Sequence, residues 1–103
     1  MNKPVLGIPQ NTIKILRKYN FSFQKKFGQN FLIDTHVLDK IIRAADIKRE
    51  DMVLEIGPGI GTMTQYLAEA AGKVIAVEID KNLIPILSET LGGYGNVRII
   101  NED

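Results

Sequence analysis

The chain has 103 residues and a formal net charge of +1, and it is 45% hydrophobic and 24% charged, as expected for one small globular domain. It contains no cysteine, which excludes a disulfide framework and a thiolate metal site and agrees with a reducing, cytoplasmic compartment. No apolar run reaches the ~20 residues of a membrane span, and the N-terminus lacks the apolar core of a signal peptide.

The charge is distributed unevenly, with +6 on residues 1–50 and −5 on residues 51–103. In residues 1–33, basic side chains alternate with aromatic ones, namely Tyr19, Phe21, Phe23, Phe27 and Phe31. RNA with exposed bases requires cations for its phosphates and rings for stacking. The residues predicted to contact RNA are Lys14, Arg17, Lys18, Lys25 and Lys26. The alternative to RNA binding is a solvated basic arm. For the aromatic side chains we favour packing against the domain over stacking on bases.

Two helices are expected in the first half of the chain. Thr12 is expected to cap a short helix over residues 13–19, and residues 21–31 are expected to form an ordered loop. Asp34 is a good N-cap for a second helix, whose apolar positions are Val37, Leu38, Ile41, Ile42 and Ala45. His36, the only histidine, has no second ligand nearby, so neither a metal site nor a catalytic histidine is predicted.

Residues 52–56 form an apolar run with one polar member, Glu55, which predicts a strand buried on both faces of a parallel sheet. Three glycines follow at alternate positions: Gly57, Gly59 and Gly61. Helical spacing then begins at Thr62. A strand, a glycine turn and a helix bring bare backbone to the positive end of a helix, where a nucleotide or nucleoside cofactor binds. Tight turns also use glycine for steric reasons alone.

The glycine spacing distinguishes between cofactors. The dinucleotide fingerprint Gly-x-Gly-x-x-Gly needs a glycine where this chain has Thr62. Glu55 would repel a diphosphate, whereas its charge suits a ligand with an ammonium or sulfonium group. The pattern therefore favours S-adenosylmethionine over NAD, and an NAD-dependent oxidoreductase domain is the alternative.

A second β-branched run, residues 73–79, leads into Glu78 and Asp80. An acidic residue roughly 20 residues after the glycine turn is where such folds bind ribose, because one carboxylate accepts hydrogen bonds from both hydroxyls. Glu78 is therefore assigned to the ribose and Asp80 to the start of the next helix. The alternative is that both acids serve that helix N-terminus.

The remaining segments continue the alternation of helix and strand. Helices are predicted over residues 62–71 and 82–91, and a last strand over residues 97–100. The first of these helices is expected to pack Met63, Tyr66, Leu67 and Ala70 against the sheet. Right-handed crossovers give an α/β fold with a parallel sheet in the order 3-2-1 and flanking helices, the N-terminal part of a Rossmann-like domain over residues 34–103.

Three blocks carry a family resemblance: Phe-Gly-Gln-Asn-Phe-Leu at residues 27–32, Glu-Ile-Gly-Pro-Gly-Ile-Gly-Thr at residues 55–62 and Glu-Ile-Asp at residues 78–80. Together they resemble the rRNA adenine N6-dimethyltransferase family, most closely its small-subunit branch, from about residue 19 to residue 103. The resemblance implies a Rossmann-like enzyme of ribosome biogenesis. Its reaction would move methyl groups from S-adenosylmethionine to N6 of two adjacent adenines in the 16S rRNA of an immature 30S subunit.

The resemblance also implies a set of cofactor contacts: Asn30, Leu32, Gly57, Gly59, Gly61, Glu78 and Asp103. Asn30 and Leu32 would contact the methionine end, Glu78 the ribose and Asp103 the adenine amino group. Gly57 would supply close backbone, and the other two glycines would keep the turn clear. The residue patterns by themselves indicate only Gly57 and Glu78.

One family motif is missing from the sequence. Asn-x-Pro-Tyr or a variant of it holds the flipped adenine in the family, and no such tetrapeptide occurs here. No residue is therefore predicted to be catalytic, and the chain is expected to lack the fourth strand onward and to be inactive alone. The uncovered edge of residues 53–56 is expected to cause self-association. A 23S rRNA methyltransferase of the antibiotic-resistance type and a non-catalytic RNA-binding module are the alternatives.

Overall fold

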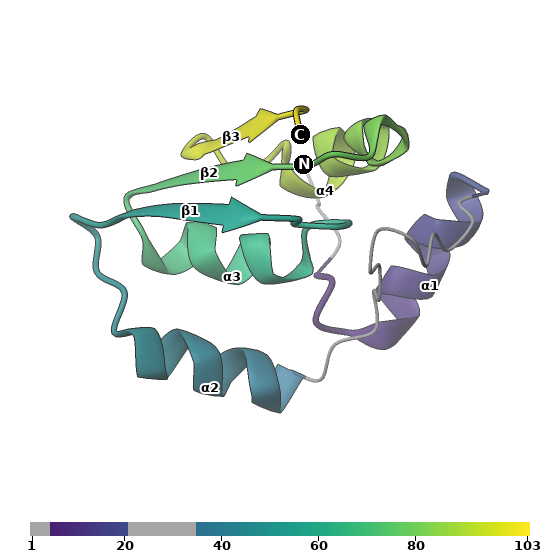
Figure 1. The fold of residues 1–103 in the computed structure, drawn as a ribbon. Helices are drawn as coiled ribbons and strands as arrows, with labels where there is room; N and C mark the ends of the chain where they lie inside the picture. The colour runs from purple at the N-terminus through teal and green to yellow at the C-terminus, as the bar shows by residue number, and fades with distance from the viewer. Residues whose placement is uncertain (1–4, 21–34) are drawn as a thin grey trace.

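A computed structural model of the chain describes residues 5–20 and 35–103. Three parallel strands form one sheet in the order β1-β2-β3: β1 (Met52–Ile56), β2 (Lys73–Val77) and β3 (Val97–Ile100). The helices are α1 (Pro9–Lys18), α2 (Thr35–Ala45), α3 (Thr62–Ala70) and α4 (Ile84–Leu91), with a 3-10 turn, η2 (Lys81–Leu83), before α4. Figure 1 shows the three strand arrows pointing the same way, with α3 and then α2 on one side of the sheet. The predicted strand order is confirmed.

One face of the sheet carries its buried residues. The parallel register aligns Val53 with Val74 and Val74 with Val97, and these three valines pack in one cluster. The helical partners in that cluster are Leu67 and Ala68 of α3 and the adjoining Ala71. Because side chains alternate across a strand, this face takes every second residue of β1.

The other face of β1 differs from the prediction. Met52, Leu54 and Ile56 are 66%, 64% and 72% exposed, so burial of the strand on both faces is wrong for this chain. These three side chains point away from the valine cluster. The helix residues of that cluster pack on the other face of the sheet, where the valines lie. The β1 sequence is that of a strand covered on both sides, but only one cover is present among residues 5–20 and 35–103.

The first helix begins earlier than predicted. It starts at Pro9, whose missing N–H is harmless in the first turn, and its N-cap residue, Ile8, makes no side-chain hydrogen bond. Thr12 therefore lies inside the helix and does not cap it. The Thr12 hydroxyl is buried and donates to the Leu6 carbonyl at 3.1 Å, which folds the preceding segment against α1.

The packing faces of α2 and α3 also differ from their predicted faces. In α2 only Leu38 is buried, whereas Val37 and Ile41 are exposed. In α3 the buried residues are Thr62, Thr64, Gln65, Leu67 and Ala68. Met63, Tyr66 and Ala70 are half-buried. The buried face of α3 is therefore rotated from the predicted one, because α3 contacts α4 and α2 as well as β2. The predicted cap Asp34 lies outside the described residues.

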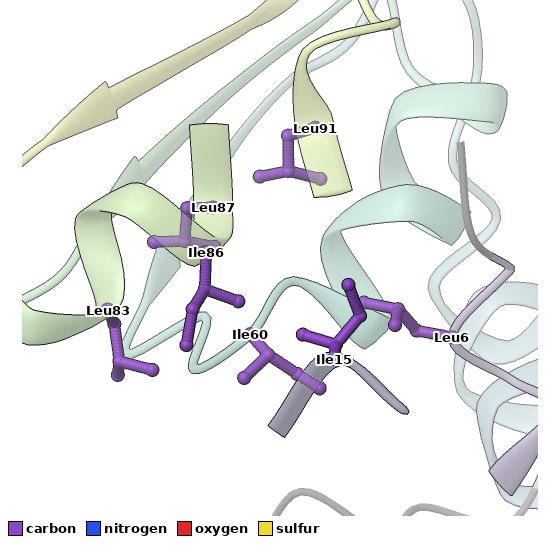
Figure 2. Close-up of a cluster of buried hydrophobic side chains, with 7 residues drawn as sticks. All are labelled: Leu6, Ile15, Ile60, Leu83, Ile86, Leu87 and Leu91. Carbon is purple, nitrogen blue, oxygen red and sulfur yellow. The ribbon is translucent and has the colours of Figure 1, made fainter. Parts of the chain in front are cut away.

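A second apolar cluster joins the N-terminal segment to α4. Figure 2 shows its members: Leu6, Ile15, Ile60, Leu83, Ile86, Leu87 and Leu91. Ile60 belongs to the glycine turn, and in this view its side chain lies between Ile15 of α1 and Leu83 of η2. The turn that follows β1 is therefore held in the core from two sides. In the described part of the chain, every helix falls short of the length and apolar character that a membrane span requires.

Candidate cofactor site

The glycine turn has the backbone conformation that requires glycine. Gly57, Gly59 and Gly61 have φ angles of 73°, 63° and 98°, all in the left-handed region. At Gly57, apart from its chain neighbours, no heavy atom of the described residues lies within 4 Å of the position that a Cβ would occupy. In this part of the chain the backbone at the end of β1 is uncovered, and its close contact with a ligand stays a prediction.

Gly61 has a different surrounding from Gly57. A Cβ at Gly61 would lie 3.0 Å from Thr90 Oγ1 and 3.2 Å from Leu91 Cδ2. The neighbouring Ile60 carbonyl accepts a hydrogen bond from the same Thr90 hydroxyl at 2.7 Å. The absence of a side chain at Gly61 therefore makes room for α4, a contact that no pattern in the sequence indicated.

Replacing Gly57 or Gly61 by alanine should distinguish a glycine needed for ligand binding from one needed for packing against α4. Gly57→Ala should cost about 1–2 kcal/mol of unfolding free energy from left-handed strain alone, but its methyl group should obstruct cofactor binding. Gly61→Ala should cost more stability, because the strain adds to the contact with Thr90. Chemical denaturation and cofactor titration of both variants test this expectation. Equal losses of stability in the two variants would contradict it.

Glu78 connects the glycine turn to the end of β2. Its side chain is 3% exposed, and its two oxygens accept the Gly59 N–H at 3.1 Å and the Asp80 N–H at 2.9 Å. A carboxylate oxygen has two lone pairs, so each oxygen retains one for a ribose hydroxyl. These two hydrogen bonds fix the orientation of the carboxylate, and contact with ribose stays a prediction. The helix assignment of Asp80 is confirmed, because Asp80 is the N-cap of η2 and accepts the Asn82 N–H at 3.0 Å.

Glu55 approaches the same turn from β1. Its half-buried carboxylate accepts the Thr64 hydroxyl of α3 at 2.5 Å. Burial raises the pKa of Glu55, the Thr64 hydrogen bond opposes that rise, and the negative charge of Glu78 adds to it. Two neighbouring acids therefore border the glycine turn. This charge disfavours a diphosphate and favours a cation, in agreement with the expectation for Glu55.

The end of β3 contributes a residue that the sequence analysis missed. Asn101 Nδ2 donates to the Glu78 carbonyl at 2.7 Å and so ties the ends of β2 and β3 together. Asp103 follows two residues later and is exposed at the same edge of the sheet. An asparagine after a strand is too common for its pattern alone to have indicated this link. The adenine contact of Asp103 stays a prediction.

Several predicted site residues lie outside the described part of the chain, namely Asn30, Leu32, Lys25 and Lys26. Lys14 and Arg17 are exposed on α1. Lys18 is also exposed, but its ammonium group binds Glu89 of α4 at 2.5 Å. Among the described residues, no group of three or more His, Cys, Asp or Glu side chains is placed to hold a metal ion.

A shallow hollow of about 460 Å³ lies at the opposite end of the sheet, where the strands begin. It is bordered by residues that precede the strands, including Arg49, Gly72 and Asn96. None of the predicted cofactor residues that the structure describes lines it. The candidate site is therefore the edge where the strands end, since the glycine turn and both acids meet there.

Solved structures share this arrangement of sheet, turn and helices. The 23S rRNA methyltransferase ErmE is 39% identical, with a TM-score of 0.67 over 72% of this chain and 30% of its own. A dimethyladenosine transferase from Plasmodium falciparum is 43% identical, with a TM-score of 0.61 over 66% of this chain and 26% of its own. These similarities and the parallel sheet with flanking helices identify the chain as the N-terminal part of a Rossmann-like, S-adenosylmethionine-dependent methyltransferase domain, and the predicted fold class is confirmed.

The family model described as ribosomal RNA adenine dimethylase matches residues 20–103, and the chain belongs to this family. A curated relative from Lachnoclostridium phytofermentans, ribosomal RNA small subunit methyltransferase A, is 72% identical over 99 residues, which are 95% of this chain and 34% of the relative. The protein of that name from Geobacillus sp. is 54% identical over 103 residues, 100% of this chain and 35% of the relative. The chain spans about a third of the length of these relatives.

Proposed function

We propose that this chain forms the cofactor-binding part of an S-adenosylmethionine-dependent enzyme that dimethylates N6 of two adjacent adenines in 16S rRNA. The observation that carries the proposal is the meeting of an open glycine turn with Glu55 and Glu78 at the carboxyl edge of a parallel sheet. Open backbone suits close approach of a nucleoside, and two acids suit its cationic sulfonium and amino groups.

The chain's own residues have binding and orienting roles in this proposal. Glu78 holds the ribose, Asp103 the adenine amino group, and Asn30 and Leu32 the methionine end. When bound, the cofactor supplies an activated methyl group. Residues of this chain contribute by fixing the position and direction of that group, which is a large part of catalysis when two reactants must be aligned. No residue of this chain is proposed to be catalytic.

Two competing functions are less well supported. The small-subunit relatives are 54–72% identical, whereas the 23S rRNA methyltransferase structure is 39% identical, which favours the small-subunit substrate. An NAD-dependent domain needs a glycine at position 62, where the helix approaches the strand closely. Thr62 is buried in that position, so its side chain occupies the space that the dinucleotide fold keeps empty.

The function is tested at two levels. Titration of this chain with S-adenosylmethionine should show binding, and titration with NADH should show none. A protein of the relatives' length that contains these residues, called here the full-length form, should add two methyl groups to each of two adjacent adenines in unmethylated 16S rRNA, as measured by mass spectrometry of nuclease fragments. RNA affinity that is indifferent to the cofactor, with no methylation, would instead support a non-catalytic RNA-binding module.

We also propose that α1 contacts the rRNA of an immature 30S subunit in the cytoplasm. Lys14 and Arg17 are exposed on α1, and they are three residues apart, on one side of the helix. Lys18 lies on the same side and shares its charge with Glu89. Lys14 and Arg17 are therefore the stronger candidates for phosphate contacts among the described basic residues of the arm.

Replacing both Lys14 and Arg17 by alanine in the full-length form should weaken rRNA binding and reduce its salt dependence. Loss of two phosphate contacts lowers the slope of log affinity against log salt by about 1.4–1.8. Fluorescence anisotropy at several salt concentrations measures both quantities. Lys40→Ala with Arg43→Ala on α2 removes the same charge from another exposed helix and is the matched control. Equal effects of the two pairs would point to net charge rather than to an α1 contact.

We further infer that the 103-residue chain by itself associates through β1. Within the described residues this strand pairs with β2 alone, and its outer side chains, Met52, Leu54 and Ile56, are largely exposed. Sedimentation velocity at increasing concentration should show dimers or larger species. Leu54→Lys with Ile56→Lys should reduce them, whereas Val37→Lys with Ile41→Lys on α2 should not. A folded monomer at all concentrations would contradict the inference.

A further inference from the structure

We propose that Thr64 is a positioning residue that holds Glu55 as the anionic partner of the cofactor's cationic amino-acid end. The inference rests on the proposed function and extends it, because it assigns two side chains to the part of the ligand that carries the reacting sulfonium. The shared chemistry is a positive charge, either the sulfonium or the ammonium group of the ligand.

The strand order decides which end of the ligand lies near Glu55. Glu78 follows β2, the middle strand, and Asp103 follows β3 on one side of it. If the ribose is at Glu78 and the adenine is toward β3, the amino-acid end extends toward β1. Glu55 is the acidic residue of β1, one position before its end. Its register partner on β2 is Ala76, two residues before Glu78, so the two acids lie on neighbouring strands near the same edge.

Thr64 is suited to hold this carboxylate in one orientation. Its side chain is fully buried in the first turns of α3, and its hydroxyl donates to Glu55 Oε1 at 2.5 Å. Within the described part of the chain, this is the hydrogen bond that Glu55 makes, so Oε2 is left for a ligand. A buried hydroxyl on a helix loses little freedom when it makes such a bond, which favours a fixed position.

The charges around Glu55 explain why a donor is needed there. Burial and the charge of Glu78 both raise the pKa of Glu55, and the Thr64 hydrogen bond acts in the opposite direction. Glu69, the one charged residue of α3, lies in its last turn, five residues after Thr64. Without the Thr64 hydroxyl, the pKa of Glu55 should rise further, and the carboxylate would lose its charge at a pH closer to neutral.

The test compares Thr64→Val, which keeps the shape but loses the donor, with Thr64→Ser, which keeps the donor. Carbon NMR of the Glu55 carboxyl group, without ligand, should give a higher pKa in the valine variant and one close to the original in the serine variant. S-adenosylmethionine affinity should fall on the order of tenfold at about pH 6 in the valine variant, and less at about pH 8. The serine variant should bind as the original chain does.

S-adenosylhomocysteine identifies the charge that Glu55 faces, since it retains the ammonium group but has a neutral sulfur. A loss confined to S-adenosylmethionine would assign Glu55 to the sulfonium, and an equal loss for both ligands would assign it to the ammonium; either result supports the proposal. An unchanged Glu55 pKa, or an affinity loss in the valine variant that does not vary with pH, would overturn it while leaving the proposed function intact. Absence of S-adenosylmethionine binding to the original chain would overturn both.

Discussion

Replacing Glu78 by glutamine should weaken S-adenosylmethionine binding by about 1–3 kcal/mol and lower the free energy of unfolding by a similar amount, about 1–3 kcal/mol. Both effects arise from one carboxylate. Its oxygens accept the Gly59 and Asp80 N–H groups, and a glutamine presents an NH₂ group to one of these donors. If Glu78 binds the ribose as proposed, the ribose would also lose a hydrogen-bond acceptor. Calorimetric titration and chemical denaturation measure the two losses separately.

Glu69→Gln is the matched control for this variant. Glu69 is exposed in the last turn of α3, where its carboxylate accepts the Tyr94 hydroxyl at 3.4 Å, away from the glycine turn. The Glu69→Gln variant should have unchanged cofactor affinity and a nearly unchanged free energy of unfolding. If Glu78→Gln lowered stability but left affinity unchanged, Glu78 would be limited to connecting the turn with β2, and the ribose assignment would be wrong.

Ile60→Ala should lower the free energy of unfolding by about 2–5 kcal/mol and also weaken cofactor binding. The Ile60 side chain is 1% exposed in the cluster that joins α1, η2 and α4, and its carbonyl accepts the Thr90 hydroxyl. Truncation leaves a cavity beneath the glycine turn. Because Ile60 lies between Gly59 and Gly61, the backbone that approaches the ligand should lose part of its fixed position.

Leu83→Ala is the control that distinguishes a general loss of stability from a change in the position of the glycine turn. Leu83 is fully buried in the same cluster but belongs to η2, outside the turn. Its truncation should cost about as much stability and have a smaller effect on S-adenosylmethionine affinity, measured at a temperature where both variants remain folded. Equal affinity losses in the two variants would show that the cluster acts through general stability and not through the turn.

The glycine turn and its flanking strands could be predicted because their signals are local. The bounds of β1 and β3 match the predicted residues 52–56 and 97–100, and β2 ends at Val77, two residues before the predicted end. The alternate glycines predicted a tight turn, and the structure adds that all three have left-handed φ angles, which glycine adopts readily. The Asp80 cap could be predicted for the same reason, since the accepting carboxylate and the Asn82 N–H belong to residues two positions apart.

Other features depend on partners distant in sequence. Gln65 is buried, accepts the Leu6 N–H at 3.0 Å and donates to the Thr90 carbonyl at 2.9 Å, across separations of 59 and 25 residues. No periodicity indicates such a link between the N-terminal segment and α4. The early start of α1 at Pro9 was missed for a related reason, because Thr12 has the residue type of a cap but its hydroxyl bonds to Leu6.

The residue pattern was enough to predict a strand, a glycine turn and a helix with an acid after the next strand, since these features depend on backbone conformation and on spacing within about 20 residues. The hydrogen bond from Gly59 to Glu78, the one from Thr64 to Glu55, and the face of β1 that the described residues leave uncovered became visible only in the folded chain. Hydrogen bonds and burial depend on which elements pack together, and different packings of the same elements satisfy the same local pattern.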